Sequence, residues 1–228
     1  MMNKPTIRED GAWLLPCAIW AVSHSELNWL PKERLSNVYI STDNGQSYRL
    51  LGGADYPNRY FDEHHILPKA DGTLAMYIRG KSDIGLSRST DGGKTWTLGE
   101  DTGLGNPNSR FCLRRLRSGR LLLVNHVNFG GLEHLYKERS NLTAFLSDDD
   151  GETWQGGLLL DERASVSYPD LAEAPDGTLN IIYDYNRYDE KEILLARFTE
   201  EDVLAGSLVS EGSALRILVN KAFGEPVQ

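Results

Sequence analysis

One eight-residue pattern occurs three times in this chain, and it limits the folds that the sequence can adopt. Each copy reads Ser-x-Asp-x-Gly-x-Ser/Thr-aromatic, and the copies span Ser41–Tyr48, Ser89–Trp96 and Ser147–Trp154. The aspartates recur after 48 and 58 residues, which is about the length of one β-propeller blade. A repeat of this period predicts a series of similar small β-sheets.

The residue types of the pattern explain why it makes a tight turn. The Asp carboxylate accepts hydrogen bonds from backbone N–H groups of its own turn, and the Gly two residues later tolerates a positive φ. The hydroxyl adds a further turn bond, and the aromatic side chain packs between neighbouring sheets. We therefore interpret the three aspartates as structural groups that hold hairpins, and we assign them no catalytic role.

A second pattern places a polar Gly turn before an apolar strand, and Asp-Gly between such runs is a strong hairpin signal. It occurs four times, at Arg8–Leu15, Lys69–Met76, Arg117–Leu123 and Ala174–Ile181. Each unit then reads as four strands, and we expect an all-β fold whose units cover about 3–52, 59–98, 108–158 and 166–200. The last unit lacks the eight-residue pattern. The units together form one partial propeller domain over residues 1–228, with one short helical turn from Thr199 to Ala205.

The composition supports a folded domain and argues against several classes of protein. Apolar residues make up 40% of the chain, which is enough for a core. The formal charge of −9 argues against a broad phosphate-binding surface, so nucleic acid is not an expected partner. No run of 18 apolar residues occurs, so no membrane span is expected. Cys17 and Cys112 lack metal-ligand spacing; we interpret them as buried thiols, a disulfide being the alternative, and expect no metal or cofactor.

The repeats and the blade pattern resemble the Asp-box (BNR) repeats of the sialidase, or neuraminidase, superfamily, and the resemblance covers nearly the whole chain. It implies a six-bladed β-propeller, of which about four blades lie in this chain. It also implies a glycoside-cleaving site with three kinds of group. An arginine triad grips the substrate carboxylate, a Tyr nucleophile is paired with a Glu, and an Asp acts as acid and base.

The fourth unit carries this resemblance furthest. Ser167–Leu171 followed by Ile182–Asp184 is similar to the sialidase stretch that holds the nucleophile and, further on, a carboxylate that anchors an arginine. The resemblance makes Tyr168 the candidate nucleophile and Asp184 the candidate anchor. Pro169 stands where the family usually has Ser, and Asp184 is one methylene shorter than the usual Glu, so both departures bear on these assignments.

The second and third units supply the remaining candidates. Phe61–Glu63 opens the innermost strand of the second unit and Arg79 closes the next strand, in the order in which sialidases place the Glu partner and one triad arginine. Glu138–Leu146 resembles the stretch with the last triad arginine, which makes Arg139 that candidate. Arg110 begins an innermost strand and is a further candidate for facing the pocket, an ion pair on the rim being the alternative.

Two parts of the family's site have no counterpart in this sequence. The resemblance places the first triad arginine and the acid/base Asp upstream of Met1. We therefore expect the chain to begin inside a longer fold, and residues 1–228 alone to show little or no turnover. Met1–Arg8 lacks the apolar stretch of a secretory signal, whereas the resemblance implies a secreted or periplasmic protein, so the compartment stays open, the cytoplasm included.

The chemistry implied by these residues is consistent. Tyr, with a reference pKa of about 10, is a weak nucleophile until a carboxylate accepts its proton, and enzymes of this type are an exception to the two-carboxylate scheme of glycosidases. Arginine binds both oxygens of a carboxylate through its planar fork. The sequence thus predicts an exo-α-sialidase-like hydrolase in which Glu63 activates Tyr168 and arginines hold the sugar carboxylate. The expected partner is a glycan with a terminal acidic sugar.

Other interpretations of the same residues stay open. In a purely structural interpretation, Tyr168 fills the propeller axis, Glu63 caps a turn, and the arginines make surface ion pairs. A polysaccharide lyase that uses Tyr168 with His64 or His65 is a second possibility, and a non-catalytic carbohydrate-binding propeller is a third. The open faces of an incomplete propeller also predict self-association.

Overall fold

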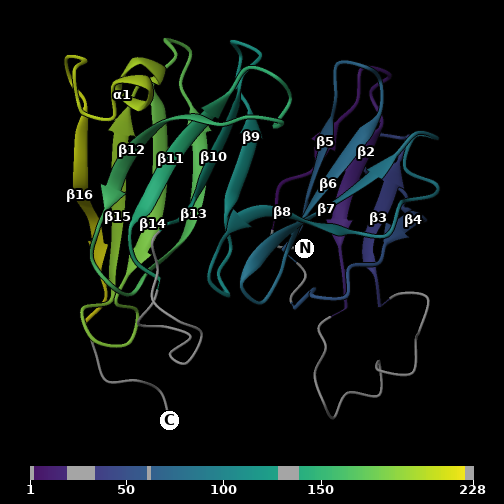
Figure 1. Cartoon of the computed structure of the whole chain (residues 1–228), viewed down its shortest axis with the longest axis horizontal. Coiled ribbons are helices and arrows are strands. Elements are labelled where there is room, and N and C mark those ends of the chain that lie inside the picture. The colour runs from purple at the N-terminus through teal and green to yellow at the C-terminus, as the bar shows by residue number, and fades with distance from the viewer. Residues whose placement is uncertain (1–2, 20–33, 61–62, 128–138, 224–228) are drawn as a thin grey trace. The chain divides into compact units, whose positions relative to one another are not determined.

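The computed structural model describes residues 3–19, 34–60, 63–127 and 139–223, and this part of the chain is all-β apart from one short helix (Figure 1). Its strands form four antiparallel sheets of four strands, and each sheet takes its strands in chain order. Successive four-stranded antiparallel sheets are the blades of a β-propeller fold. The predicted fold class is confirmed.

The bounds of the strands follow the four sheets. The first sheet comprises β1 (Thr6–Ile7), β2 (Trp13–Cys17), β3 (Ser36–Ser41) and β4 (Arg49–Ala54). The second comprises β5 (His65–Pro68), β6 (Leu74–Arg79), β7 (Asp83–Ser89) and β8 (Glu100–Gly105). The third comprises β9 (Cys112–Arg115), β10 (Leu121–His126), β11 (Leu142–Ser147) and β12 (Gln155–Asp161). The fourth comprises β13 (Val166–Glu173), β14 (Leu179–Tyr185), β15 (Glu192–Phe198) and β16 (Ala214–Lys221).

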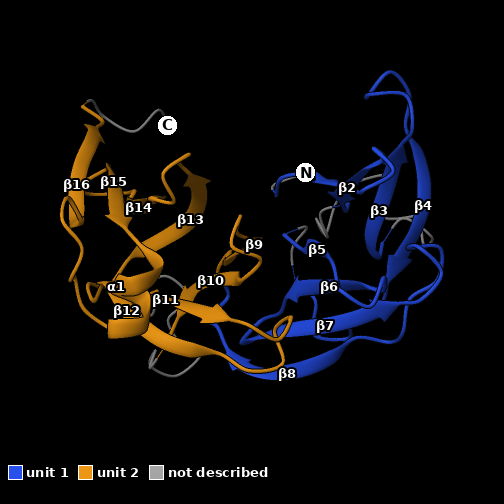
Figure 2. Ribbon diagram, turned by 90° about the horizontal axis from the view of Figure 1, so that it is seen from above, with its two compact units in different colours: residues 1–108 blue, residues 109–228 orange. Residues whose placement is uncertain are grey.

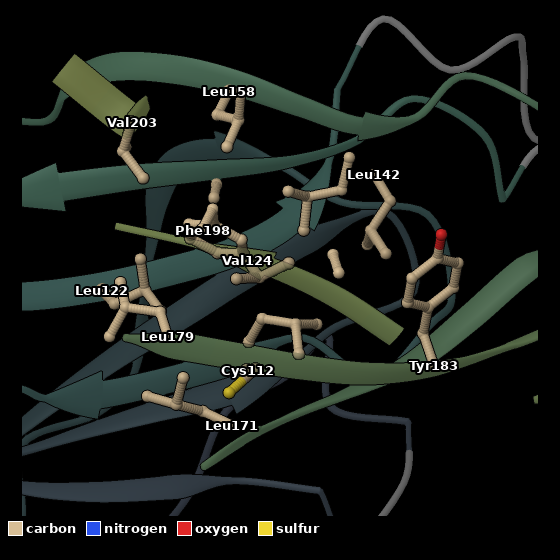
Figure 3. Close-up of a cluster of buried hydrophobic side chains, with 14 of the residues drawn as sticks. Cys112, Leu122, Val124, Leu142, Leu158, Leu171, Leu179, Tyr183, Phe198 and Val203 are labelled. Atoms are coloured by element: carbon tan, nitrogen blue, oxygen red, sulfur yellow. The ribbon is translucent and has the colours of Figure 1, made fainter. Parts of the chain in front are cut away.

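The chain divides into two compact units, residues 1–108 with the first two sheets and residues 109–228 with the last two (Figure 2). We call them unit 1 and unit 2, and each contains its own hydrophobic cluster. The cluster of unit 1 includes Leu14, Val38, Met76 and Ile78. The cluster of unit 2 includes Leu122, Val124, Leu179 and Tyr183, whose side chains converge in Figure 3. Burying side chains of this size contributes about 1.5–3 kcal/mol each. A single domain over residues 1–228 stays a prediction.

The eight-residue pattern forms the turn between the third and fourth strands of the first three sheets, and we call these segments the repeat turns. In the second, Asp91 Oδ1 accepts from the backbone N–H of Thr95 at 2.9 Å and Asp91 Oδ2 from the Thr95 hydroxyl at 2.6 Å. Gly93 has φ +95°, and Trp96 packs against the cluster of unit 1. The turn chemistry expected from the sequence is present.

The fourth sheet is longer than its predicted unit. The predicted helical turn is present as α1 (Glu200–Ala205), which Thr199 caps through its side chain. The chain then returns as β16, which pairs with β15 and completes the sheet beyond residue 200, the limit expected from the sequence. Among the described residues, no helix is long and apolar enough to cross a membrane.

The two thiols differ in burial. Cys112 is buried as predicted, whereas Cys17 is only half-buried, and no disulfide joins the two. The prediction of burial is therefore wrong for Cys17, because its strand, β2, alternates buried and partly exposed positions and Cys17 takes a partly exposed one.

Candidate functional site

Tyr168 lies at an irregularity in the innermost strand of the fourth sheet. The pairing of β13 with β14 shifts its register between Ser167 and Asp170, and Tyr168 there has φ +58°. A left-handed backbone costs an L-residue with a Cβ about 1–2 kcal/mol. Bulges of this kind redirect a side chain out of the regular alternation of a strand.

Two guanidinium groups lie over the ring of Tyr168. The Cζ of Arg139 is 5.8 Å from the ring centroid and the Cζ of Arg187 is 4.6 Å from it, both within cation–π range. Arg139 is buried, with 5% of its surface exposed, whereas a third of the Arg187 side chain is exposed, at 33%. The structure therefore brings the predicted residues Tyr168 and Arg139 together and adds Arg187, which the sequence prediction missed.

Asp184 connects Arg187 to the strand that carries Tyr168. Asp184 is paired with Ser167 across β13 and β14, and its Oδ1 accepts from the Ser167 hydroxyl at 2.6 Å. Arg187 Nη2 donates to Asp184 Oδ2 at 2.5 Å and to Ser167 Oγ at 2.9 Å. Asp184 therefore binds an arginine in the turn after its own strand, β14, three residues further along the chain. The sequence prediction assigned Asp184 to an arginine upstream of Met1.

Arg110 contacts the segment that follows Tyr168. Its side chain is buried, Nη1 donates to the carbonyl of Pro169 at 3.1 Å, and Nη2 lies 3.4 Å from Asp170 Oδ1. The ion pair given as the alternative in the sequence prediction exists, with the Arg110 side chain buried and the Asp170 side chain 32% exposed. In this structure the contacts of Arg110 hold the backbone next to Tyr168.

Unit 1 contains the other two predicted residues, Glu63 and Arg79. Arg79 ends β6, is buried, and pairs with the buried carboxylate of Glu63 through Nη1. The rest of its guanidinium binds Asn108, which the sequence prediction missed: Nε lies 3.1 Å and Nη2 2.6 Å from Asn108 Oδ1. Phe61 and Asp62, which the prediction places beside Glu63, lie outside the described residues. The pairing of Glu63 with Tyr168 joins the two units and stays a prediction.

Two buried histidines, His64 and His126, are oriented by backbone carbonyls. In unit 1, His64 Nε2 lies 2.8 Å from the carbonyl oxygen of Asn37. In unit 2, His126 Nδ1 lies 3.0 Å from the carbonyl oxygen of Ser140. Burial, with a smaller contribution from the charge of Arg139, lowers the pKa of His126 to about 4. His126 is therefore a neutral neighbour of Arg139 at neutral pH.

Unit 2 contains a small hollow that is lined in part by the two arginines over the Tyr168 ring. Its volume is about 20 Å³, which gives room for about one water-sized group. Its lining residues come from the segment before β11, from the start of β13 and from the turn after β14: Arg139, Ser165, Ser167, Asn186, Arg187 and Tyr188. The described residues contain no group of three or more His, Cys, Asp or Glu side chains arranged to hold a metal ion.

Comparison with known proteins shows which family the chain belongs to. Residues 1–181 match the family model of the BNR repeat-like domain. A search of the curated proteins finds no relative of this sequence.

Several solved structures have a similar fold. An intramolecular trans-sialidase of Ruminococcus gnavus is 19% identical with a TM-score of 0.60, covering 85% of this chain and 42% of that chain. The NanB sialidase of Streptococcus pneumoniae is 14% identical with a TM-score of 0.59, covering 87% and 30%. An α-L-arabinofuranosidase of Fusarium graminearum is 15% identical with a TM-score of 0.55, covering 85% and 60%. At these identities the likeness shows the fold, that of a sialidase-type propeller.

The chain is shorter than these proteins. The first three similar structures are matched over 48%, 42% and 27% of their own lengths, so this chain spans less than half of each.

Proposed function

The chain belongs to the BNR repeat-like family of the sialidase superfamily, and from this we propose that it is part of a glycoside hydrolase that removes terminal acidic sugars, sialic acid above all, from glycans. The similar structures include sialidases and an arabinofuranosidase. Because one fold carries both activities, the fold by itself does not select the sugar, and the choice depends on the residues around Tyr168.

The observation that carries the proposal is the position of Tyr168 under two guanidinium groups, at 5.8 and 4.6 Å from its ring centroid. A phenol is neutral when protonated, so it does not repel an anionic sugar as a carboxylate nucleophile would. Arginines beside it attract that sugar's carboxylate and keep their charge at every physiological pH. A site for a neutral sugar gains nothing from either feature.

In the proposed reaction, the oxygen of Tyr168 attacks the anomeric carbon and displaces the rest of the glycan, while Glu63 accepts the phenolic proton. Water then cleaves the tyrosyl–sugar bond, so the configuration at the anomeric carbon is retained. Arg79 and Arg139 bind the sugar carboxylate. Asp184 and Arg110 position the groups around Tyr168 through the contacts described above.

A trapping experiment tests this proposal directly. The protein is incubated with 2,3-difluoro-N-acetylneuraminic acid, which loses fluoride from the anomeric carbon when a nucleophile attacks it and leaves a long-lived adduct. We expect one adduct, on the peptide that contains Tyr168, by mass spectrometry. Tyr168→Phe should bind N-acetylneuraminic acid as the wild type does and form no adduct. An adduct that persists in Tyr168→Phe, or one on another residue, refutes the assignment of the nucleophile.

Assays on the same protein distinguish a hydrolase from a lyase and from a binding module. Incubation with 4-methylumbelliferyl glycosides of N-acetylneuraminic acid, glucuronic acid and L-arabinofuranose compares hydrolysis of acidic and neutral sugars. A lyase leaves an unsaturated sugar that absorbs in the ultraviolet, and a hydrolase does not. A protein that binds the sugar and neither cleaves it nor forms the adduct is a binding module.

A further inference from the structure

The first sheet exposes an apolar row on the face opposite its core. Leu15, Tyr39 and Leu50 are paired in register across β2, β3 and β4, so their side chains lie on one face of the sheet. Leu50 is 40% exposed, and Leu15 and Tyr39 are half-buried. The other face carries Leu14 and Ile40, which are paired with each other and belong to the cluster of unit 1. We call the exposed three residues the Leu50 row.

The fourth sheet exposes a second row at the same three strand positions. Ile182, Leu195 and Ile217 are paired in register across β14, β15 and β16, which lie side by side in Figure 1. Ile182 is 41% and Ile217 37% exposed, and Leu195 is half-buried. The other face carries Ile181 and Ala196, which are paired and belong to the cluster of unit 2. We call the exposed three residues the Ile217 row.

Packing inside each unit shows which way each face is directed along the chain. In unit 1, the face of the first sheet that carries Leu14 shares a hydrophobic cluster with Met76 of the second sheet. In unit 2, the face of the fourth sheet that carries Ile181 shares a cluster with Leu122 of the third sheet. The first sheet therefore packs on the sheet that follows it, and the fourth sheet packs on the sheet that precedes it. Because all four sheets have the same strand order, the two exposed rows lie on opposite kinds of face, and faces of opposite kind pack together in this chain.

The packing of the second sheet on the first shows how two such faces fit. The second repeat turn lies directly on β4, where a Cβ at Gly52 would collide with the carbonyl oxygen of Gly93. Trp96, the aromatic residue of this turn, packs against the cluster of unit 1. The corresponding aromatic residue of the first repeat turn, Tyr48, is 50% exposed and borders Gly45 together with Trp13. The first sheet thus exposes the same kind of turn with which the second sheet packs on its neighbour.

We propose that copies of this chain associate head to tail, with the Leu50 row of one copy packed on the Ile217 row of another. A second copy supplies the matching face itself, and contact between the rows removes apolar surface of both from water. The contact joins two different surfaces and is therefore heterologous, so a dimer keeps one unused row at each end. Further copies can add to either end.

Sedimentation velocity on residues 1–228 tests this pairing with two matched variants. Leu50→Lys blocks the row of the first sheet, and Ile217→Lys blocks the row of the fourth sheet. The two side chains are similarly exposed, at 40% and 37%, and both lie on the last strand of their sheets. Leu208→Lys, at a position 40% exposed and outside the strands, is the control. Circular dichroism shows whether each variant is folded, and Tyr48→Lys replaces Leu50→Lys if the latter does not fold.

We expect the wild type and Leu208→Lys to form dimers and then larger species as the concentration rises. Leu50→Lys alone and Ile217→Lys alone should each dissociate at concentrations about 10-fold higher or more, because a charge placed in an apolar contact is costly to bury. An equimolar mixture of these two variants should form dimers with close to the wild-type affinity and no larger species. Each variant keeps the row that the other has lost, so one intact contact forms per pair.

Three results overturn the inference. If either blocked variant alone associates as strongly as the wild type, the contact does not require both rows. If the mixture stays monomeric at concentrations at which the wild type is dimeric, the two rows do not bind each other. A wild type that stays monomeric throughout the concentration series excludes the assembly altogether.

Discussion

Tyr168 has a backbone conformation that a tyrosine avoids in a regular strand. Its φ of +58° lies in the left-handed region, where an L-residue with a Cβ is about 1–2 kcal/mol less stable than in its usual conformations. The residues on either side are held in place. Arg187 binds the side chain of Ser167, and Arg110 binds the carbonyl of Pro169. Strain that neighbours maintain in this way is frequent at functional sites.

This conformation predicts an unusual order of stability. Replacing Tyr168 by Gly should give a more stable protein than replacing it by Ala, by about 1 kcal/mol, because Gly has no Cβ to clash at positive φ. Urea unfolding measures the difference. At Ile182, in regular pairing on β14, the order should be reversed, since Gly in a strand is less stable than Ala by about 0.5–1 kcal/mol. If the Gly and Ala variants have the same order of stability at both positions, the backbone of Tyr168 is not strained.

At the scale of single residues, the sequence predicts site residues that stand in motifs. It misses residues whose contacts form only in the folded chain. Tyr168, Arg139 and Asp184 stand in stretches whose order carries information. In the structure, Arg139 lines the hollow and lies over the Tyr168 ring. Asp184 binds Arg187, which lines the same hollow. Arg187 lies in a polar turn after β14, where an arginine has no predicted partner. Its spacing of three residues from Asp184 is a local signal that could have identified it. Asn108 contacts Arg79 over 29 positions, which no local pattern reveals.

The repeat turns are elements whose stability depends on ionised carboxylates. In the third turn, hydrogen bonds from the hydroxyl and then the backbone N–H of Thr153, and from Ser147, lower the pKa of Asp149 from 3.8 to about 2. A lowered carboxyl pKa stabilises the folded state above the unfolded pKa of about 3.8, and this contribution is lost as the pH falls through about 2.

Asp149→Asn should therefore lower the unfolding midpoint at pH 7, and the gap from the wild type should narrow below about pH 4 as Asp149 becomes protonated in the wild type. Thermal unfolding followed by circular dichroism from pH 7 to pH 2 measures the gap. Thr153→Val removes the hydroxyl bond and should reproduce part of the loss. A gap that stays constant over this range contradicts the role of the charged form.

The elements themselves differ in how far the sequence predicts them. The turns and the strands beside them follow from Asp, Gly and hydroxyl positions, because their bonds are local. The sequence prediction ended the fourth unit at residue 200 and did not include β16, whose side chains from Arg216 to Asn220 are all exposed in the structure. β16 is a strand because it pairs with β15. This pairing depends on residues outside β16.

At the scale of the whole molecule, two separate hydrophobic clusters divide the chain between unit 1 and unit 2. A unit with its own core retains the burial that stabilises it when the other is absent. We expect residues 109–228, expressed alone, to fold with dispersed amide signals in an NMR spectrum and to unfold cooperatively. A fragment without dispersed signals, while the full chain gives them, contradicts independent folding.

The fourth sheet exposes apolar side chains on the face opposite its core. Ile182, Leu195 and Ile217 follow one another across β14, β15 and β16 in register, and Ile182 is 41% and Ile217 37% exposed. An apolar row of this kind favours association. We expect the chain to form dimers as its concentration rises, and Ile217→Lys to shift the equilibrium to monomers in sedimentation experiments. Leu208→Lys, outside the sheets, is the control; equal association of all three proteins contradicts this surface.

The residues that line the hollow all lie between Arg139 and Tyr188, a stretch of about fifty consecutive positions in one polypeptide. The hollow is therefore built by one short, continuous stretch of unit 2. Substitutions confined to this stretch can alter every wall of the hollow while the sequence of unit 1 stays unchanged.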